Sequence, residues 1–197
     1  MSQSIISLYH LKAASFCASS EVPRYYLNGV YVTAEARCST YVATDGYVLF
    51  ACRSELLDGE ADNTLLGSWI VPTANCVPFK FRPREDRPTA ILSGTDKSLN
   101  LAQGSQSITF APIDGSFPDW RLIVPSEASG SSDGVTFDVA LLSRLAKAGA
   151  ALCHKHPNWT PNGDRPAPVH FGDSANAFGV IVPLVSENKF IRPNWSR

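Results

Sequence analysis

The chain has 197 residues, of which 44% are hydrophobic and 18% are charged, and its formal net charge is −1. This composition is typical of a folded globular protein and argues against a disordered chain. Because the charge is close to neutral, it gives no global signal for nucleic acid, and any DNA-facing surface has to be a local patch.

The first predicted stretch, about residues 4–53, combines one helix with several strands. Residues 8–18 place apolar side chains near helical spacing, which predicts a short amphipathic helix. Residues 25–32 are rich in aromatic and β-branched side chains, which favour a strand. Residues 39–52 are predicted to form a hairpin around Thr44-Asp45-Gly46, because glycine accepts the positive φ of a tight turn.

The second stretch, about residues 68–125, follows a polar connecting loop. Residues 69–72 are predicted to form a strand, and residues 73–81 a short helix that Pro78 limits. A charged loop comes next, and Asp114-Gly115 is a further turn signal. Three more strands are predicted at residues 90–92, 98–102 and 107–111.

A Ser- and Gly-rich segment, residues 126–134, is interpreted as a linker to the third stretch, residues 135–185. Asp138 is a plausible N-cap for a helix that continues to about Leu152. Four prolines between residues 157 and 168 exclude regular structure there. The apolar stripe of this helix is predicted to comprise Val139, Leu142, Leu145, Ala146 and Gly149. The strands predicted here are residues 135–137, 169–171 and 178–185.

The element order therefore predicts an α+β fold of mostly antiparallel strands, in which a strand, a helix and further strands recur about three times. The polar tail, residues 186–197, follows the last strand. The first residues lack a signal-peptide pattern, and no apolar run approaches the roughly 18 residues that span a bilayer. We therefore expect a cytoplasmic protein, with no membrane among its partners. The five cysteines are odd in number, and without a CxxC pair they are expected to be reduced and mostly buried.

Five segments of the sequence resemble the bacterial DNA sliding clamp, the DNA polymerase III beta subunit. Residues 24–30 (RYYLNGV) and 42–49 (VATDGYVL) resemble the family's RYYLNG strand and ATDGHRL hairpin in its middle domain. Residues 117–125 (FPDWRLIVP) resemble the FPDYRRVLP segment that closes that domain. Residues 137–153 resemble the last helix of the third domain, and residues 180–184 (VIVPL) resemble its VVMPM end. The segments occur in the family's order.

This resemblance implies the sliding-clamp fold, in which half-domains of one helix backed by antiparallel strands form a ring around DNA. Residues 1–125 then correspond to the middle domain, with half-domains at about 4–53 and 68–125. Residues 135–185 correspond to the second half of the last domain, and the first domain has no counterpart here. Since family rings contain twelve half-domains, three per chain imply a homo-oligomer, a ring of four chains, if the rotation closes. A monomer or an open dimer is the alternative.

The resemblance also implies an apolar cleft that receives peptides from polymerase and repair proteins. Plain core packing is the alternative for any single residue of this set. An Asp in place of Ile181 is expected to abolish peptide binding and to leave the fold intact. The family's His-Arg after Asp-Gly is Tyr47-Val48 here, so a basic residue of the rim is lost. The matching positions are Leu27, Thr44, Gly46, Tyr47, Leu49, Pro125, Val180, Ile181, Val182, Pro183 and Leu184.

A DNA-facing surface is the second implied site, and it would hold double-stranded DNA without reading its sequence. Arginine and lysine can meet phosphates, and tyrosines can stack on an exposed base. Ordinary solvated helix charges are the alternative explanation for the cations of the third helix. The residues matched to this surface are Lys12, Arg24, Tyr25, Tyr26, Arg144 and Lys147.

Catalytic and metal-binding patterns are not found in the sequence. Cys153, His154 and His156 lie close together, with His170 further on, but a second ligand pair of zinc-site spacing is lacking. No phosphate-binding Gly-rich loop, GxSxG or HExxH motif is present. We therefore expect neither an enzyme nor a metal or other cofactor.

Three functions remain open at this point. The first is a sliding-clamp-like processivity factor that encircles DNA and binds client proteins. The second is a clamp mimic that captures clamp-binding peptides without encircling DNA, and the third is a clamp-like scaffold with unrelated partners. The charged loop at residues 82–87 and the tail have no family counterpart; docking of the tail in a neighbour's cleft and a frayed terminus are both possible.

Overall fold

The computed structural model describes residues 2–77, 79, 87–128, 135–154, 156–172 and 175–185. The tail at residues 186–197 and most of the predicted linker and charged loop lie outside these residues.

A strand, a helical segment and three strands follow one another three times along the chain. The first group comprises β1 (Gln3–Ser7), α1 (Leu8–Ser15), β2 (Gly29–Ala34), β3 (Cys38–Thr44) and β4 (Val48–Glu55). The second comprises β5 (Gly67–Pro72), the 3-10 turn η2 (Thr73–Asn75), β6 (Thr89–Thr95), β7 (Ser98–Gln103) and β8 (Gln106–Phe110). The third comprises β9 (Val135–Thr136), α2 (Val139–Ala151), β10 (Pro157–Trp159), β11 (Ala167–Phe171) and β12 (Ala177–Ile181). Three short elements complete the chain: η1 (Tyr25–Leu27), η3 (Trp120–Ile123) and β13 (Leu184–Val185).

The two larger sheets each contain strands from more than one of these groups. One sheet has four strands in the order β1-β6-β7-β8, so the first strand of the first group completes the second group. A second sheet has seven strands in the order β10-β11-β12-β4-β3-β2-β5, and a small third sheet pairs β13 with β9. The third group is joined to the first by antiparallel pairing of β12 with β4, in which Leu49 lies opposite Val180. Residues far apart in the sequence thereby meet at one strand pair.

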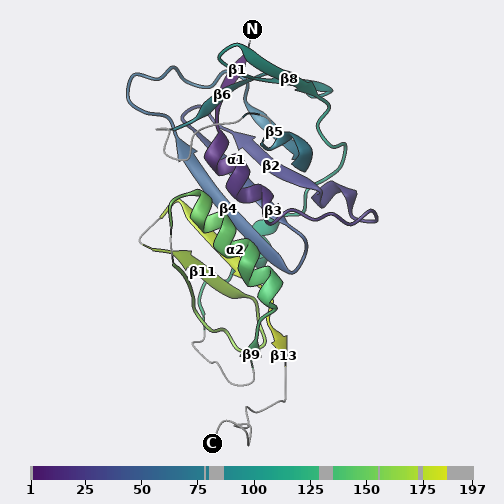
Figure 1. Ribbon diagram of the computed structural model, residues 1–197, viewed down its shortest axis with the longest axis vertical. Coiled ribbons are helices and arrows are strands. Elements are labelled where there is room, and N and C mark those ends of the chain that lie inside the picture. Colours follow the sequence, from purple (N-terminus) through teal and green to yellow (C-terminus); the bar gives the residue numbers. More distant parts are fainter. Residues whose placement is uncertain are drawn as a thin grey trace, which may run out of the picture.

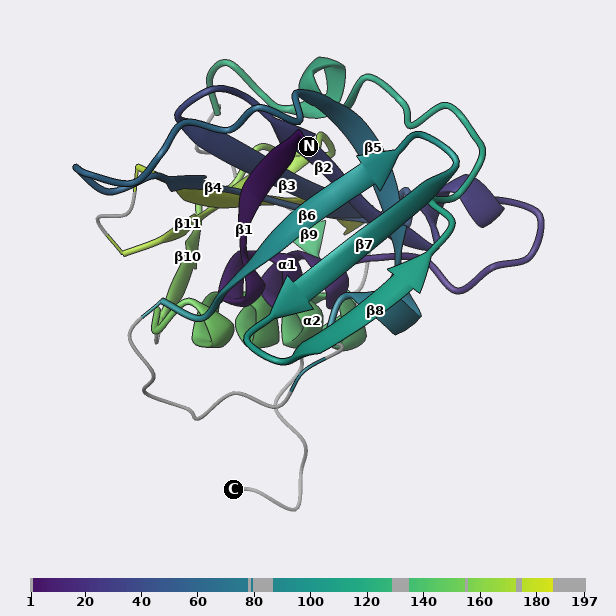
Figure 2. The same ribbon diagram turned by 90° about the horizontal axis from the view of Figure 1, so that it is seen from above.

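Helices α1 and α2 lie side by side on one face of the seven-stranded sheet (Figure 1; Figure 2). The main core lies between this face and the helices, and it includes Tyr41, Phe50 and Phe171 among its fully buried side chains. Gly149 of α2 brings the helix close to the sheet, because a Cβ there would lie 2.5 Å from a ring carbon of Phe171. The two helices form one continuous layer.

The opposite face of this sheet carries a smaller core beneath the segment that follows β8. Leu49 and Val180 are buried there, and Phe117 and Trp120 pack over this cluster. The ring of Phe117 stacks on Tyr31 with 4.9 Å between centroids and an interplanar angle of 4°. The segment that contains η3 is thus fixed across the junction between β4 and β12.

Several predicted elements are confirmed. Helix α2 begins after Asp138, whose carboxylate accepts a hydrogen bond from the Ala140 amide at 2.7 Å, as an N-cap does. The strands β5 to β8 and β11 lie where the sequence predicts them. Cys153 is exposed. Four of the cysteines are buried without disulfides, namely Cys17, Cys38, Cys52 and Cys76.

Other predictions differ from the structure. Residues 25–27 form the turn η1 rather than a strand, since the Leu27 amide bonds the Arg24 carbonyl at 2.9 Å. Within the described part of residues 73–81, helical structure is limited to the short turn η2. The prediction of no regular structure between residues 157 and 168 is wrong for β10, where Pro157 is tolerated because it opens an edge strand. Val139 and Ala146 are exposed, so they lie outside the buried stripe of α2.

Candidate peptide cleft

A small hollow of about 60 Å³ lies where the β3–β4 hairpin meets the end of β12. Antiparallel pairing of β4 with β12 brings the two sides together, and the Val182 amide donates to the Tyr47 carbonyl at 2.8 Å. The first and third groups of elements therefore both contribute to this site. Its lining residues are Thr44, Gly46, Tyr47, Val48, Leu49, Ile123, Pro166, Val180 and Val182.

The hairpin turn is fixed by its own polar side chains. One carboxylate oxygen of Asp45 accepts from the amides of Tyr47 at 2.8 Å and Val48 at 2.9 Å. The Thr44 hydroxyl accepts from the Gly46 amide at 3.0 Å. Gly46 has a φ of 97°, in the left-handed region that favours glycine. Asp45 thus stabilises the turn of the hairpin.

Buried residues form the floor of the hollow, and exposed apolar residues form its rim. Leu49, Val180 and Thr44 are buried. Tyr47 and Ile123 keep 56% and 44% of their surface exposed. Large apolar side chains that stay exposed around a hollow are typical of a surface that binds a partner.

Arg24 lies beside the hairpin at this rim. A Cβ on Gly46 would lie 2.5 Å from Nη1 of Arg24, and the guanidinium lies 5.9 Å from the centroid of the Tyr47 ring. An ion pair with Glu21, 2.7 Å between Nη2 and the carboxylate, holds the arginine on the exposed surface. A cation therefore borders the cleft, although the family's basic residues are absent from the hairpin itself.

Of the predicted cleft residues, the structure brings six around the hollow: Thr44, Gly46, Tyr47, Leu49, Val180 and Val182. The predicted members that do not line it are Leu27, Pro125, Ile181, Pro183 and Leu184. Ile181 is fully buried in the main core, because alternate residues of β12 point to opposite faces of the sheet. Val48, Ile123 and Pro166 line the hollow without having been predicted. The resemblance of residues 117–125 could have identified Ile123, which lies two residues before Pro125.

The residues predicted to face DNA are divided between two surfaces. Lys12 lies on α1, and Lys147 is exposed on α2, so both belong to the helix layer. Tyr25 is exposed and Tyr26 is partly buried, with 5.9 Å between their ring centroids in an edge-to-face arrangement. Arg24 lies on the cleft side of the hairpin, as described above. The assignment of these residues to DNA stays a prediction.

Arg144 is placed differently from what a DNA contact requires. Its guanidinium donates to the carbonyl oxygens of Phe16 at 2.8 Å and Ala18 at 2.7 Å. It also forms an ion pair with Asp45. The N–H donors of this side chain therefore bind acceptors within the protein rather than pointing toward the solvent.

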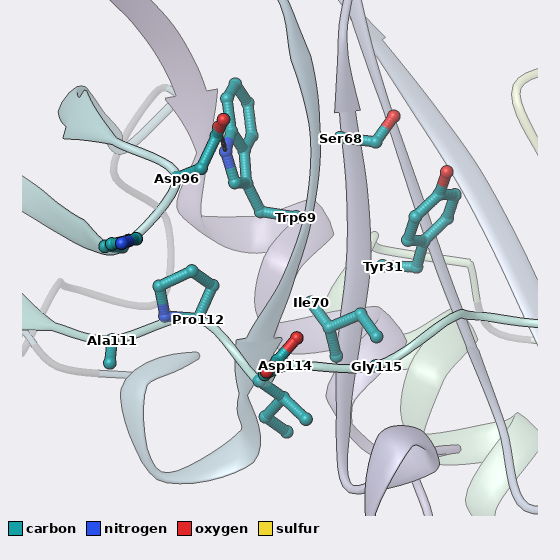
Figure 3. A pocket seen from close by; sticks show the side chains of 11 residues that line it. Tyr31, Ser68, Trp69, Ile70, Asp96, Ala111, Pro112, Asp114 and Gly115 are labelled. Atoms are coloured by element: carbon teal, nitrogen blue, oxygen red, sulfur yellow. Dashed lines mark hydrogen bonds between the residues drawn. The ribbon is translucent and has the colours of Figure 1, made fainter.

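A larger hollow of about 570 Å³ lies along the outer edge of β5 (Figure 3). The Trp69 indole donates to the Asp96 carboxylate there at 3.1 Å, and the Ile113 amide donates to the Ile70 carbonyl at 2.9 Å. Tyr31 and Pro112 are among its other lining residues, and none of the predicted site residues lines it. The hollow is thus separate from the predicted cleft.

Within the described ranges, no three His, Cys, Asp or Glu side chains are grouped as metal ligands would be. No helix in the part of the chain that the structure describes has the length and apolarity needed to cross a membrane.

Curated relatives that match the sequence are beta sliding clamps. The Haemophilus influenzae clamp is 30% identical over 125 residues, which are 63% of this chain and 33% of that protein. The Caulobacter vibrioides clamp is 29% identical over 116 residues, 57% of this chain and 30% of that protein. The matched region thus spans about a third of the length of these relatives. No protein-family model matches the chain.

Solved structures of sliding clamps have the same fold. The DNA polymerase III beta subunit of Pseudomonas aeruginosa superposes with a TM-score of 0.73 at 18% identity, covering 93% of this chain and 66% of that one. The Bartonella birtlesii sliding clamp, solved with bound griselimycin, gives a TM-score of 0.69 at 19% identity with the same coverage. The chain therefore has the sliding-clamp fold, and its sequence is similar to about a third of the length of bacterial beta sliding clamps.

Proposed function

We propose that the chain is a clamp-like, non-catalytic DNA-tethering protein that binds short peptide segments of polymerase or repair proteins in the cleft at the β4–β12 junction. The observation that carries the proposal is the hollow itself, with a buried apolar floor and the exposed rim residues Tyr47 and Ile123. Both sides of the cleft come from one chain. A single copy should therefore bind a peptide.

Griselimycin is a suitable probe, because a sliding clamp of the same fold was solved with it bound. We expect isothermal titration of the full 197-residue chain to give saturable binding of one griselimycin per chain. Absence of binding at millimolar griselimycin would contradict the peptide-cleft proposal.

Encirclement of DNA is the second part of the proposal, and it requires a closed ring. Three half-domains per chain, at about residues 4–53, 68–125 and 135–185, would give a ring of twelve with four chains. The adjacent helices α1 and α2 supply the continuous layer that a pore wall needs. Since β4 is already paired with β12, we propose that β8 of one chain, which ends the four-stranded sheet, pairs with β10 of the next. Such a head-to-tail contact forms a ring only if its rotation closes.

The solution mass decides whether such a ring exists. Light scattering on a sizing column, at several protein concentrations, is expected to give a mass near four times 21.3 kDa. A monomer at every concentration would exclude topological tethering, since one chain cannot surround DNA. If such a monomer bound griselimycin, the proposal of a peptide cleft would still be supported.

A clamp mimic that captures client peptides without encircling DNA is the second candidate. The position of Arg144 favours it, because one of the predicted DNA-facing cations is bound within the chain. The net charge of −1 points the same way, since non-specific DNA binding relies on phosphate neutralisation. This candidate needs the cleft alone, and the mass measurement separates it from the ring.

A further inference from the structure

We propose that Arg144 is a positioning residue for the cleft: it links the helix layer to the hairpin that forms one side of the peptide site. This inference rests on the proposed peptide-binding function for its consequence, but its geometry stands independently. Arg144 lies on α2 in the third group of elements, and Asp45 lies in the hairpin of the first.

The guanidinium joins three elements at once. Its Nε and Nη2 donate to the carbonyl oxygens of Phe16 and Ala18, which follow the end of α1. A cation is favourable at that end, because the last carbonyls of a helix carry partial negative charge. Its Nη1 donates to the second carboxylate oxygen of Asp45. A planar guanidinium can serve three acceptors in fixed directions, which a lysine cannot do.

Asp45 transmits this link to the cleft. The carboxylate oxygen that does not face Arg144 accepts from the amides of Tyr47 and Val48, and both of these residues line the hollow. The exposed fractions of the Arg144 and Asp45 side chains are 25% and 13%, so water competes weakly with the pair. Releasing Arg144 should therefore free the Asp45 carboxylate to turn away and loosen the Tyr47 side of the cleft.

A second cation of α2 lies beside the pair. Lys147 lies one turn further along α2 and lines the same surface hollow of about 470 Å³ as Arg144, Asp45 and Glu21. Lys147 is exposed, and its ammonium group lacks the planar set of donors with which Arg144 binds the carbonyl oxygens after α1. It is the matched control, since its substitution removes the same charge from the same helix.

The ligand-free experiment is amide hydrogen exchange of the full chain, read at Tyr47 and Val48. Arg144→Gln is expected to raise exchange at both amides about tenfold or more, because their common acceptor is no longer held. Lys147→Gln should match the unmodified chain. Arg144→Lys is expected to fall between them, since the ammonium can still pair with Asp45. Unchanged exchange at Tyr47 and Val48 in Arg144→Gln would overturn the inference.

The functional readout is griselimycin affinity in a double-mutant cycle with Asp45→Asn, whose amide oxygen can still accept from the turn. Each single variant should weaken binding about tenfold, which corresponds to about 1.4 kcal/mol. The double variant should be no weaker than either single variant, because both remove one interaction. Additive losses would overturn the coupling. If Arg144→Gln does not fold, Asp45→Asn tests the same link from the hairpin side, and Arg144→Lys should give a smaller loss of affinity, since its ammonium can still pair with Asp45.

The two failures can be told apart. A chain that does not bind griselimycin contradicts the proposed function, whereas the exchange result at Tyr47 and Val48 still decides the role of Arg144.

Discussion

Replacing Ile181 with Asp is expected to unfold the chain, rather than to abolish peptide binding by a protein that stays folded. Ile181 is 0% exposed and packs in the main core beneath α2. A carboxylate there would have no partner, and burying an unpaired charge or polar group costs several kcal/mol, on the order of 4 or more. Because whole domains are stable by only about 5–15 kcal/mol, most of the folded population should be lost. Thermal unfolding followed by circular dichroism measures this loss.

Ile123→Asp is the control for this substitution. It introduces the same carboxylate at a position that is 44% exposed, where water can solvate the charge. Its Tm should remain within a few degrees of the unmodified chain. If Ile181→Asp instead kept a native Tm and lost only griselimycin binding, Ile181 would have to lie in the cleft, as the resemblance implied.

The contrast between Ile181 and Val180 shows what the sequence could not decide. The apolar run of residues 178–185 predicts a strand, but a continuous apolar run does not reveal which face each residue occupies. The face is set by the antiparallel pairing with β4, which places Val180 opposite Leu49. A one-residue uncertainty in register exchanges cleft and core positions. The sequence could therefore identify the segment but not every residue within it.

Local signals were sufficient for other parts of the site. Asp45-Gly46 predicts the hairpin, and the structure has the turn there with Gly46 at positive φ. Asp138 predicts the start of α2, because capping depends on neighbouring residues alone. Similarity in residues 24–49 predicted the clamp fold, which the solved structures match. These features depend on short stretches of chain.

The role of Arg144 depends on contacts that no local pattern reveals. Its partners Phe16 and Ala18 precede it by 128 and 126 residues, and its partner Asp45 in the cleft hairpin by 99. From the sequence, Arg144 and Lys147 are equivalent cations on one helix face. Only the packing of α2 beside α1 directs one of them inward and leaves the other exposed.

Ile123→Asp is also expected to weaken griselimycin binding about 30-fold or more while the fold is retained. Ile123 lines the hollow with 44% of its surface exposed, so a bound peptide would cover it, and burying an Ile side chain completely stabilises by about 1.5–3 kcal/mol. The introduced carboxylate would have to lose water against the apolar floor formed by Leu49 and Val180. Isothermal titration of both proteins at the same temperature measures the ratio of Kd values.

Leu122→Asp is the matched control, because Leu122 is the preceding residue of η3, is 82% exposed and does not line the hollow. It places the same charge next to the site and should change the Kd less than threefold. Equal losses in the two variants would indicate a general effect of negative charge rather than a contact at the rim. Unchanged affinity in Ile123→Asp would remove η3 from the cleft, and the peptide would then have to bind through the hairpin and the end of β12 alone.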